Sequence, residues 1–336
     1  MRAAIMNRAS LHFLLAALVA IALPLFMRSG TLASEVLIFA MAAAACNLLL
    51  GYTGLLSFGQ GIFFGLGSYA AGLTLLHTSL PLALALVLSA ITGAVVATGV
   101  GWLSIRRQGV YFVMLTLAFS QFFYFLAYTF KDITGGDNGL LNIPRPAIGP
   151  FSLGESWAYY AFVAVLFLLL FAALQRVASS TFGRTLLAVR DNEERARAIG
   201  FPVRNFKITA FAISGAVTGL AGALHALLIG VAPLSNIDYH MSESILIMTI
   251  IGGTGNLFAS VLGAGFYVIV SDLLSSIWPR WLLLLGGLLI VVALFMQKGL
   301  WGLLERLVEA LPMGRKSSIN SSIESPIQPE SEGRGI

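Results

Sequence analysis

The chain has 336 residues, of which 58% are hydrophobic and only 10% are charged. Soluble domains carry about 25% charged residues, so this composition excludes an ordinary water-soluble globule. The net charge of +5 requires no nucleic-acid partner, because the basic residues lie in loops between apolar segments.

The apolar segments predict a fold made of membrane-spanning helices. About 20 apolar residues in a helix cross a hydrocarbon core of roughly 30 Å. Windows of about this length recur along the chain, which predicts an all-α integral membrane protein, a polytopic bundle of about ten transmembrane helices. The expected spans are 11–27, 34–50, 54–76, 81–103, 109–129, 157–175, 208–230, 242–254, 257–277 and 281–297.

The eighth expected span differs from the others. It is short and ends in Gly252-Gly253-Thr254-Gly255, which indicates a broken or re-entrant helix. A loosened backbone at membrane depth is tolerated only where protein or a wet cavity covers it.

The distribution of Lys and Arg predicts the orientation, because these residues accumulate in cytoplasmic loops. With the N-terminus inside, 16 of the 20 Lys and Arg fall on the cytoplasmic side. We therefore expect a transmembrane domain over 1–312 with both termini cytoplasmic. Within it, 131–156 is a periplasmic loop and 176–207 a cytoplasmic loop. Residues 313–336 are rich in Ser, Pro, Glu and Gly, which predicts a disordered tail.

The cytoplasmic loop contains a charged run over 182–200. Its pattern predicts one or two short amphipathic helices outside the bilayer, which end at Gly200-Phe201-Pro202. The expected apolar face consists of Leu186, Leu187, Val189, Ala196 and Ile199. Such an element suits docking to a soluble partner that pushes on it. An interfacial helix held by anionic lipid explains the same pattern.

A second candidate segment runs from Asn47 to Tyr69. Ser57, Gly61 and Gly65 recur every fourth residue, which favours close helix packing in lipid. The segment also carries polar side chains, namely those of Asn47, Ser57, Gln60 and Tyr69. Because polar groups are costly at membrane depth, these side chains either line a wet path or bind one another.

Few other residues point to chemistry. Glu243 and Asp272 fall in or near expected spans, and they are the carboxylates on which an ion-coupled secondary transporter would depend. Asp272 equally fits the outer membrane interface. Cys46 is the only cysteine and lies in an apolar span, and no His pair has metal-ligand spacing. No G-x-x-x-x-G-K-[ST] motif or catalytic nucleophile motif occurs, so we expect no cofactor, no metal and no enzyme activity, and any ATP must be hydrolysed by a separate chain.

Four motifs together carry a family resemblance: Asn47 to Tyr69, Thr134 to Leu140, Phe182 through Gly200 into Lys207-Ile208-Thr209-Ala210-Phe211, and Ile250 to Asn256 with the Gly263-Ala264-Gly265 that follows. Over about residues 35–305 the chain resembles the permease subunits of branched-chain amino acid ABC importers, of the LivM type. In such permeases the loop before the seventh span resembles the motif that couples a permease to its ATPase. Here this motif departs from the usual Glu-Ala-Ala, because Arg195 separates Glu194 from Ala196.

The resemblance implies an ABC importer permease fold in a bacterial inner membrane. It also implies a second related permease subunit, two cytoplasmic ABC ATPase subunits, a periplasmic substrate-binding protein and transport of branched-chain or related amino acids. For the transport we hypothesise alternating access. The same family pattern serves urea and short-amide importers. The expected ATPase-coupling residues are Arg190, Glu193, Glu194, Ala196, Ala198 and Gly200, and the expected translocation-path residues are Asn47, Ser57, Gln60, Tyr69 and Glu243.

Overall fold

A computed structural model describes residues 2–27, 29–78, 80–146, 153–280, 282–287, 290 and 299–302. The longer helices are α1 (Arg2–Phe26), α2 (Gly30–Thr53), α3 (Gln60–His77), α4 (Leu82–Ser104), α5 (Val110–Thr129), α7 (Ser156–Ser179), α10 (Val203–Ile229), α11 (Tyr239–Gly252) and α12 (Leu257–Ile277). The shorter elements are α6 (Lys131–Thr134), η1 (Gly136–Asn138), α8 (Thr181–Asp191), α9 (Glu193–Ala198) and η2 (Leu234–Asn236).

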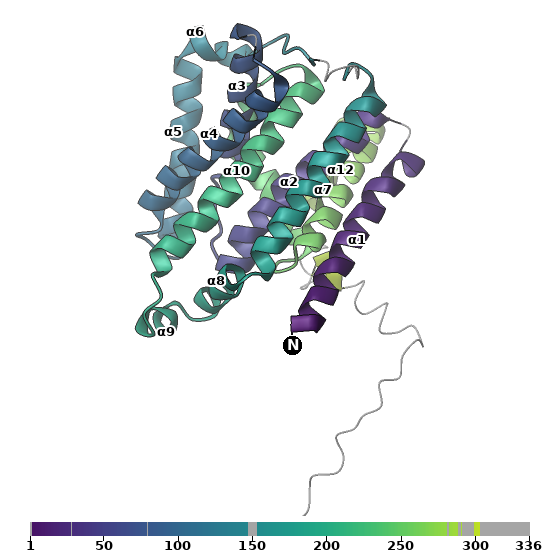
Figure 1. Cartoon of the computed structure of the whole chain (residues 1–336). Helices are drawn as coiled ribbons and strands as arrows, with labels where there is room; N and C mark the ends of the chain where they lie inside the picture. The colour runs from purple at the N-terminus through teal and green to yellow at the C-terminus, as the bar shows by residue number, and fades with distance from the viewer. Residues whose placement is uncertain are drawn as a thin grey trace, which may run out of the picture.

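The long helices lie side by side in one bundle (Figure 1). The N-terminus of α1 lies at the same end as α8 and α9, and α6 lies at the opposite end (Figure 1). The loop after α4 shares the α8–α9 end, since the Arg204 guanidinium of α10 stacks 5.2 Å from the Trp102 ring. The N-terminus, the loop after α4 and the α8–α9 segment, which the predicted topology places in the cytoplasm, therefore lie at one end of the bundle.

The polytopic helical fold is confirmed, but the count of ten spans is not. Within the described ranges, six helices are long and apolar enough to cross a membrane: α2, α4, α5, α7, α10 and α12. The apolar part of α1, His12–Phe26, is shorter, and α11 has only 14 residues. The expected span 281–297 lies largely outside the described residues.

The helix expected at 54–76 begins later than predicted. Gly54 ends α2 in the left-handed conformation, with φ +72°, and the Leu55 amide donates to the Leu49 carbonyl at 3.2 Å. A left-handed glycine is the usual end of a helix. The chain then continues without helix until Gln60. Ser57 therefore lies in a connecting segment, and the predicted stripe of Ser57, Gly61 and Gly65 does not form one helical face.

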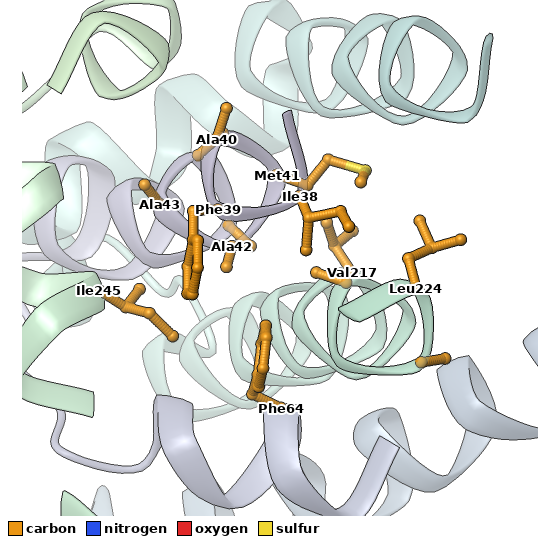
Figure 2. Packing of buried hydrophobic residues seen from close by; sticks show 14 of the residues in the cluster. Ile38, Phe39, Ala40, Met41, Ala42, Ala43, Phe64, Val217, Leu224 and Ile245 are labelled. Atoms are coloured by element: carbon orange, nitrogen blue, oxygen red, sulfur yellow. The ribbon is translucent and has the colours of Figure 1, made fainter. Parts of the chain in front are cut away.

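Helix α2 forms the centre of the bundle and is almost entirely buried. Its run of alanines, Ala42–Ala45, keeps its surface narrow so that several helices approach it closely. Figure 2 shows side chains from four helices meeting here: Ile38, Phe39, Ala40, Met41, Ala42 and Ala43 of α2, Phe64 of α3, Val217 and Leu224 of α10, and Ile245 of α11. The core is thus organised around one central helix.

Helix α10 contacts α3 and α4 backbone to backbone. A Cβ atom at Gly67 of α3 would lie 2.1 Å from the Gly219 carbonyl oxygen, and one at Gly93 of α4 would lie 2.2 Å from the Gly215 oxygen. These positions leave no room for any side chain. The glycines therefore fix how closely the three helices pack.

Candidate functional site

The charged run over 182–200 folds into two short helices, α8 and α9, as predicted. Ser180 caps α8 by accepting a hydrogen bond from the Gly183 amide, and Asn192 caps α9 by accepting one from the Arg195 amide at 2.8 Å. Such side chains satisfy amides that have no partner within the helix. The two caps explain why a run with few apolar residues is helical.

Most of the predicted apolar face of this element is correct. Leu186, Val189 and Ala196 are buried, and Val189 and Ala196 pack with Val203 at the start of α10. Ile199 is 69% exposed, so its placement on that face was wrong. The reason is that α9 ends at Ala198, before Ile199 can continue its periodicity.

Helix α9 is joined to α10 by an ion pair. The Lys207 ammonium lies 2.6 Å from one carboxylate oxygen of Glu193, and the Arg197 guanidinium lies 2.8 Å from the other. Lys207 belongs to α10, and its side chain is only 5% exposed. This ion pair therefore connects α9 to the base of α10.

Helix α8 is joined to α2 by Arg190. Its Nη1 donates a hydrogen bond to the Gly51 carbonyl near the end of α2. A Cβ atom on Gly255 would lie 3.8 Å from the same nitrogen. Arg190 thus binds the end of the central helix and lies beside the glycine break that follows α11.

Asn47 holds the glycine break against α2. Its Nδ2 lies within hydrogen-bond distance of the Asn256 carbonyl at 2.8 Å and of Ser260 Oγ at 2.6 Å, and the Gly253 carbonyl is 3.2 Å away. Its Oδ1 accepts from the Gly255 amide at 3.0 Å. The side chain is fully buried, so its polar groups are satisfied by protein.

Gln60, the first residue of α3, uses its side-chain amide to bind α10, as Asn47 binds the glycine break. Its Nε2 donates to Ser214 Oγ at 3.1 Å, and its Oε1 accepts from Thr218 Oγ1 at 2.8 Å. Ser214 Oγ in turn donates to the Ala45 carbonyl of α2 at 2.8 Å. This network joins α2, α3 and α10.

Helices α3 and α11 both begin within the bundle, and their first turns are hydrogen-bonded to each other. Ser242 of α11 donates to the Phe58 carbonyl at 2.6 Å and accepts from the Gly61 amide at 2.7 Å. Sequence reasoning did not single out Ser242, Ser214 or Lys207. The rule that selected Asn47, a polar side chain inside an apolar segment, would have found the two serines.

The other predicted residues do not gather at one place. Glu194, Ala198 and Gly200 are exposed, Ser57 and Tyr69 are buried, and the Tyr69 hydroxyl has no hydrogen-bond partner among the described residues. Glu243 is half exposed, and a carboxylate oxygen lies 3.4 Å from His240 Nδ1. Asp272 lines a cavity of about 260 Å³ together with Glu35 of α2.

Comparison with known proteins identifies the family of this bundle. Residues 28–294 match the family described as the permease component of the branched-chain amino acid transport system. The chain belongs to this family. The match includes α8, α9 and the glycine break, so the contacts that connect α8 and α9 to the bundle lie within the matched region.

Individual relatives are similar over most of their length. The high-affinity branched-chain amino acid transport system permease protein LivM of Escherichia coli is 29% identical over 86% of this chain and 74% of its own. A probable LivM of Methanocaldococcus jannaschii is 28% identical over 70% of this chain and 72% of its own. The autoinducer 2 import permease LsrC of an Enterobacter is 30% identical over 74% of this chain and 71% of its own, so permeases named for another solute also resemble this one.

Proposed function

We propose that this permease is one of two related membrane subunits of an ATP-driven importer for branched-chain or related amino acids. Two ATPases dock on α8 and α9, and a periplasmic binding protein delivers the solute. The names of the LivM relatives support the solute class. A ligand screen on the cognate binding protein tests it, and selective binding of urea, a short amide or autoinducer 2 would contradict it.

The observation that carries the coupling proposal is the pair of joints between the α8–α9 element and the bundle. Glu193 binds Lys207 of α10, and Arg190 binds Gly51 of α2. A soluble partner that displaces α8 and α9 therefore moves two long helices at once. Glu194 and Ala198 point away from the bundle, as exposed side chains, and are available to that partner.

Alternating access would act on the helix starts inside the bundle. Asn47, Ser57 and Gln60 lie around the breaks before α3 and after α11, and Tyr69 lies further along α3. The side chains of Asn47 and Gln60 are hydrogen-bonded to protein in this state. They can therefore bind a solute only when these hydrogen bonds to protein are replaced by hydrogen bonds to the solute. In this proposal Tyr69 and Glu243 belong to the periplasmic half of the path.

The orientation follows from placing the α8–α9 end in the cytoplasm, with both termini inside and about ten crossings. The described residues 299–302 reach that same end, since a Cβ atom at Gly299 would lie 2.7 Å from Gly253. Labelling with an impermeant thiol reagent tests the orientation, because the native Cys46 is buried. Ala198→Cys should react only after permeabilisation and Asp132→Cys in intact cells, and the reverse pattern would contradict the proposal.

A matched glycine pair tests the coupling role. Gly200 between α9 and α10 has φ +91°, and Gly109 before α5 has φ +60°, and neither has an atom within 4 Å of an added Cβ. Alanine at either site costs about 1–3 kcal/mol of backbone strain, because both glycines have a positive φ. Gly200→Ala should lower the uptake per ATP hydrolysed in reconstituted vesicles, whereas Gly109→Ala should leave that ratio unchanged. Equal ratios in both variants would contradict a coupling role for this joint.

A further inference from the structure

Helix α5 lies at the edge of the bundle (Figure 1) and exposes a continuous row of side chains. The row, here called the α5 stripe, consists of Tyr111, Met114, Ala118, Gln121, Phe125 and Tyr128, all exposed. Its members are separated alternately by three and four residues. This spacing places them along one side of the helix, as in the seam by which two helices pack together.

Helix α1 provides an internal comparison. Leu14, Leu18, Ile21 and Leu25 follow the same spacing and are 64–83% exposed. This row is aliphatic throughout, which suits contact with lipid chains. The α5 stripe instead has an amide at its centre and aromatic rings on both sides.

Gln121 decides against lipid as the neighbour of the α5 stripe. It is the twelfth of the 20 residues of α5, so it lies about 16 Å along a helix of about 30 Å, near the middle of the membrane. Its amide has no hydrogen-bond partner within the parts of the chain that the structure describes. An amide facing hydrocarbon without a partner is unfavourable, so this surface calls for a polar partner.

The opposite side of α5 touches both helix starts inside the bundle. Thr116 accepts a hydrogen bond from the Phe58 amide at 3.2 Å, just before α3. Ser120 donates one to the Ile237 carbonyl at 3.3 Å, just before α11. A partner on the α5 stripe would therefore be separated from the starts of α3 and α11 by the width of one helix.

We propose that the α5 stripe is the surface on which the second permease subunit packs, with Gln121 hydrogen-bonded to a polar side chain of that subunit. The inference rests on the proposed function, in which two related permeases work as a pair. The partner must be membrane-embedded, because Gln121 lies at mid-membrane depth, beyond the reach of ATPases and a binding protein. It presents an apolar helix with a hydrogen-bonding group opposite Gln121, and Ala118 allows close approach one turn away.

Site-specific photo-cross-linking in native membranes tests the contact. The complete transporter carries a benzophenone amino acid either in place of Gln121 or, as the control, in place of Ile21 of α1, which is 71% exposed. We expect an adduct with a second, related permease chain from position 121 and none from position 21. An adduct only with lipid or with another copy of this chain, in a complex that retains the second permease, would overturn the inference. Failure of any second permease to co-purify would instead contradict the proposed function, and the contact with it.

A substitution gives an independent readout. Gln121→Leu should reduce retention of the second permease on a detergent-washed affinity column about fivefold, the effect of one interhelical hydrogen bond in a membrane. Leu18→Gln on α1 serves as the matched control and should leave retention unchanged. If Gln121→Leu retains the partner fully and raises the melting temperature of the isolated chain, the α5 stripe faces lipid and the inference is wrong.

Discussion

The Lys207 ammonium lies 2.6 Å from the Glu193 carboxylate, and the two partners are unequally buried. The Lys207 side chain is 5% exposed and that of Glu193 is 21% exposed. Glu193 also contacts Arg197, so it is shared between its own helix and α10. Because the cation is the more buried partner, loss of the carboxylate costs more than loss of the pair.

The first prediction follows from this asymmetry. Glu193→Ala should destabilise the protein by about 3 kcal/mol, because it leaves a buried ammonium without a partner. The double variant Glu193→Ala/Lys207→Met should recover most of the loss. Glu194→Ala, at the exposed neighbouring position, is the control and should be neutral. Apparent melting temperatures in detergent measure all three, and a double variant as unstable as Glu193→Ala would refute the argument.

The second prediction concerns Asn47. Asn47→Leu removes the side chain that binds the 253–260 segment and leaves the Gly255 amide without its acceptor. Each unsatisfied buried group costs about 1–3 kcal/mol, so folded yield and melting temperature should fall clearly. Asn205→Leu, at an exposed position on α10, should change neither. If both variants melt alike, Asn47 does not hold the glycine break in place.

The third prediction separates coupling from folding at Arg190. Arg190→Ala removes the contact between α8 and the end of α2, while Leu186 and Val189 still anchor α8. We expect little change in melting temperature and a several-fold lower uptake at unchanged ATP hydrolysis in vesicles. The control is Arg195→Ala, since Arg195 is exposed. Loss of folded protein in Arg190→Ala, or uptake equal to wild type, would each contradict a transmitting role.

The sequence predicted features that depend on local periodicity. The bounds of α12 agree with the expected span 257–277, and the two helices of the α8–α9 element were expected from their amphipathic pattern. The later start of α3 was missed, because apolarity continues across Gly54 while the backbone there turns left-handed. Hydropathy averaged over a window of sequence does not show where the backbone hydrogen bonds of a helix end.

Long-range partners were beyond the reach of the sequence alone. Asn47 was recognised as a polar residue at membrane depth, but its partners lie more than 200 positions along the chain. Lys207 was counted as a basic residue of a cytoplasmic loop and as the start of a family motif, whereas the structure buries it on Glu193. A single sequence gives residue types and spacing, and helix packing decides which of these groups meet.

The fourth prediction uses the close contact between α3 and α10. A Cβ atom at Gly67 would lie 2.1 Å from the Gly219 oxygen, whereas one at Gly99 of α4 meets no atom within 4 Å. Gly67→Ala should therefore cost about 1–3 kcal/mol, because the backbones must move apart. Gly99→Ala should be neutral or stabilise by up to about 1 kcal/mol, since alanine favours a helix. Melting temperatures of the two purified variants measure the difference. Both changes add one methyl group to an apolar helix, so a drop confined to Gly67→Ala identifies the backbone contact as its cause. Equal melting temperatures would show that α3 and α10 are less tightly packed than this distance requires.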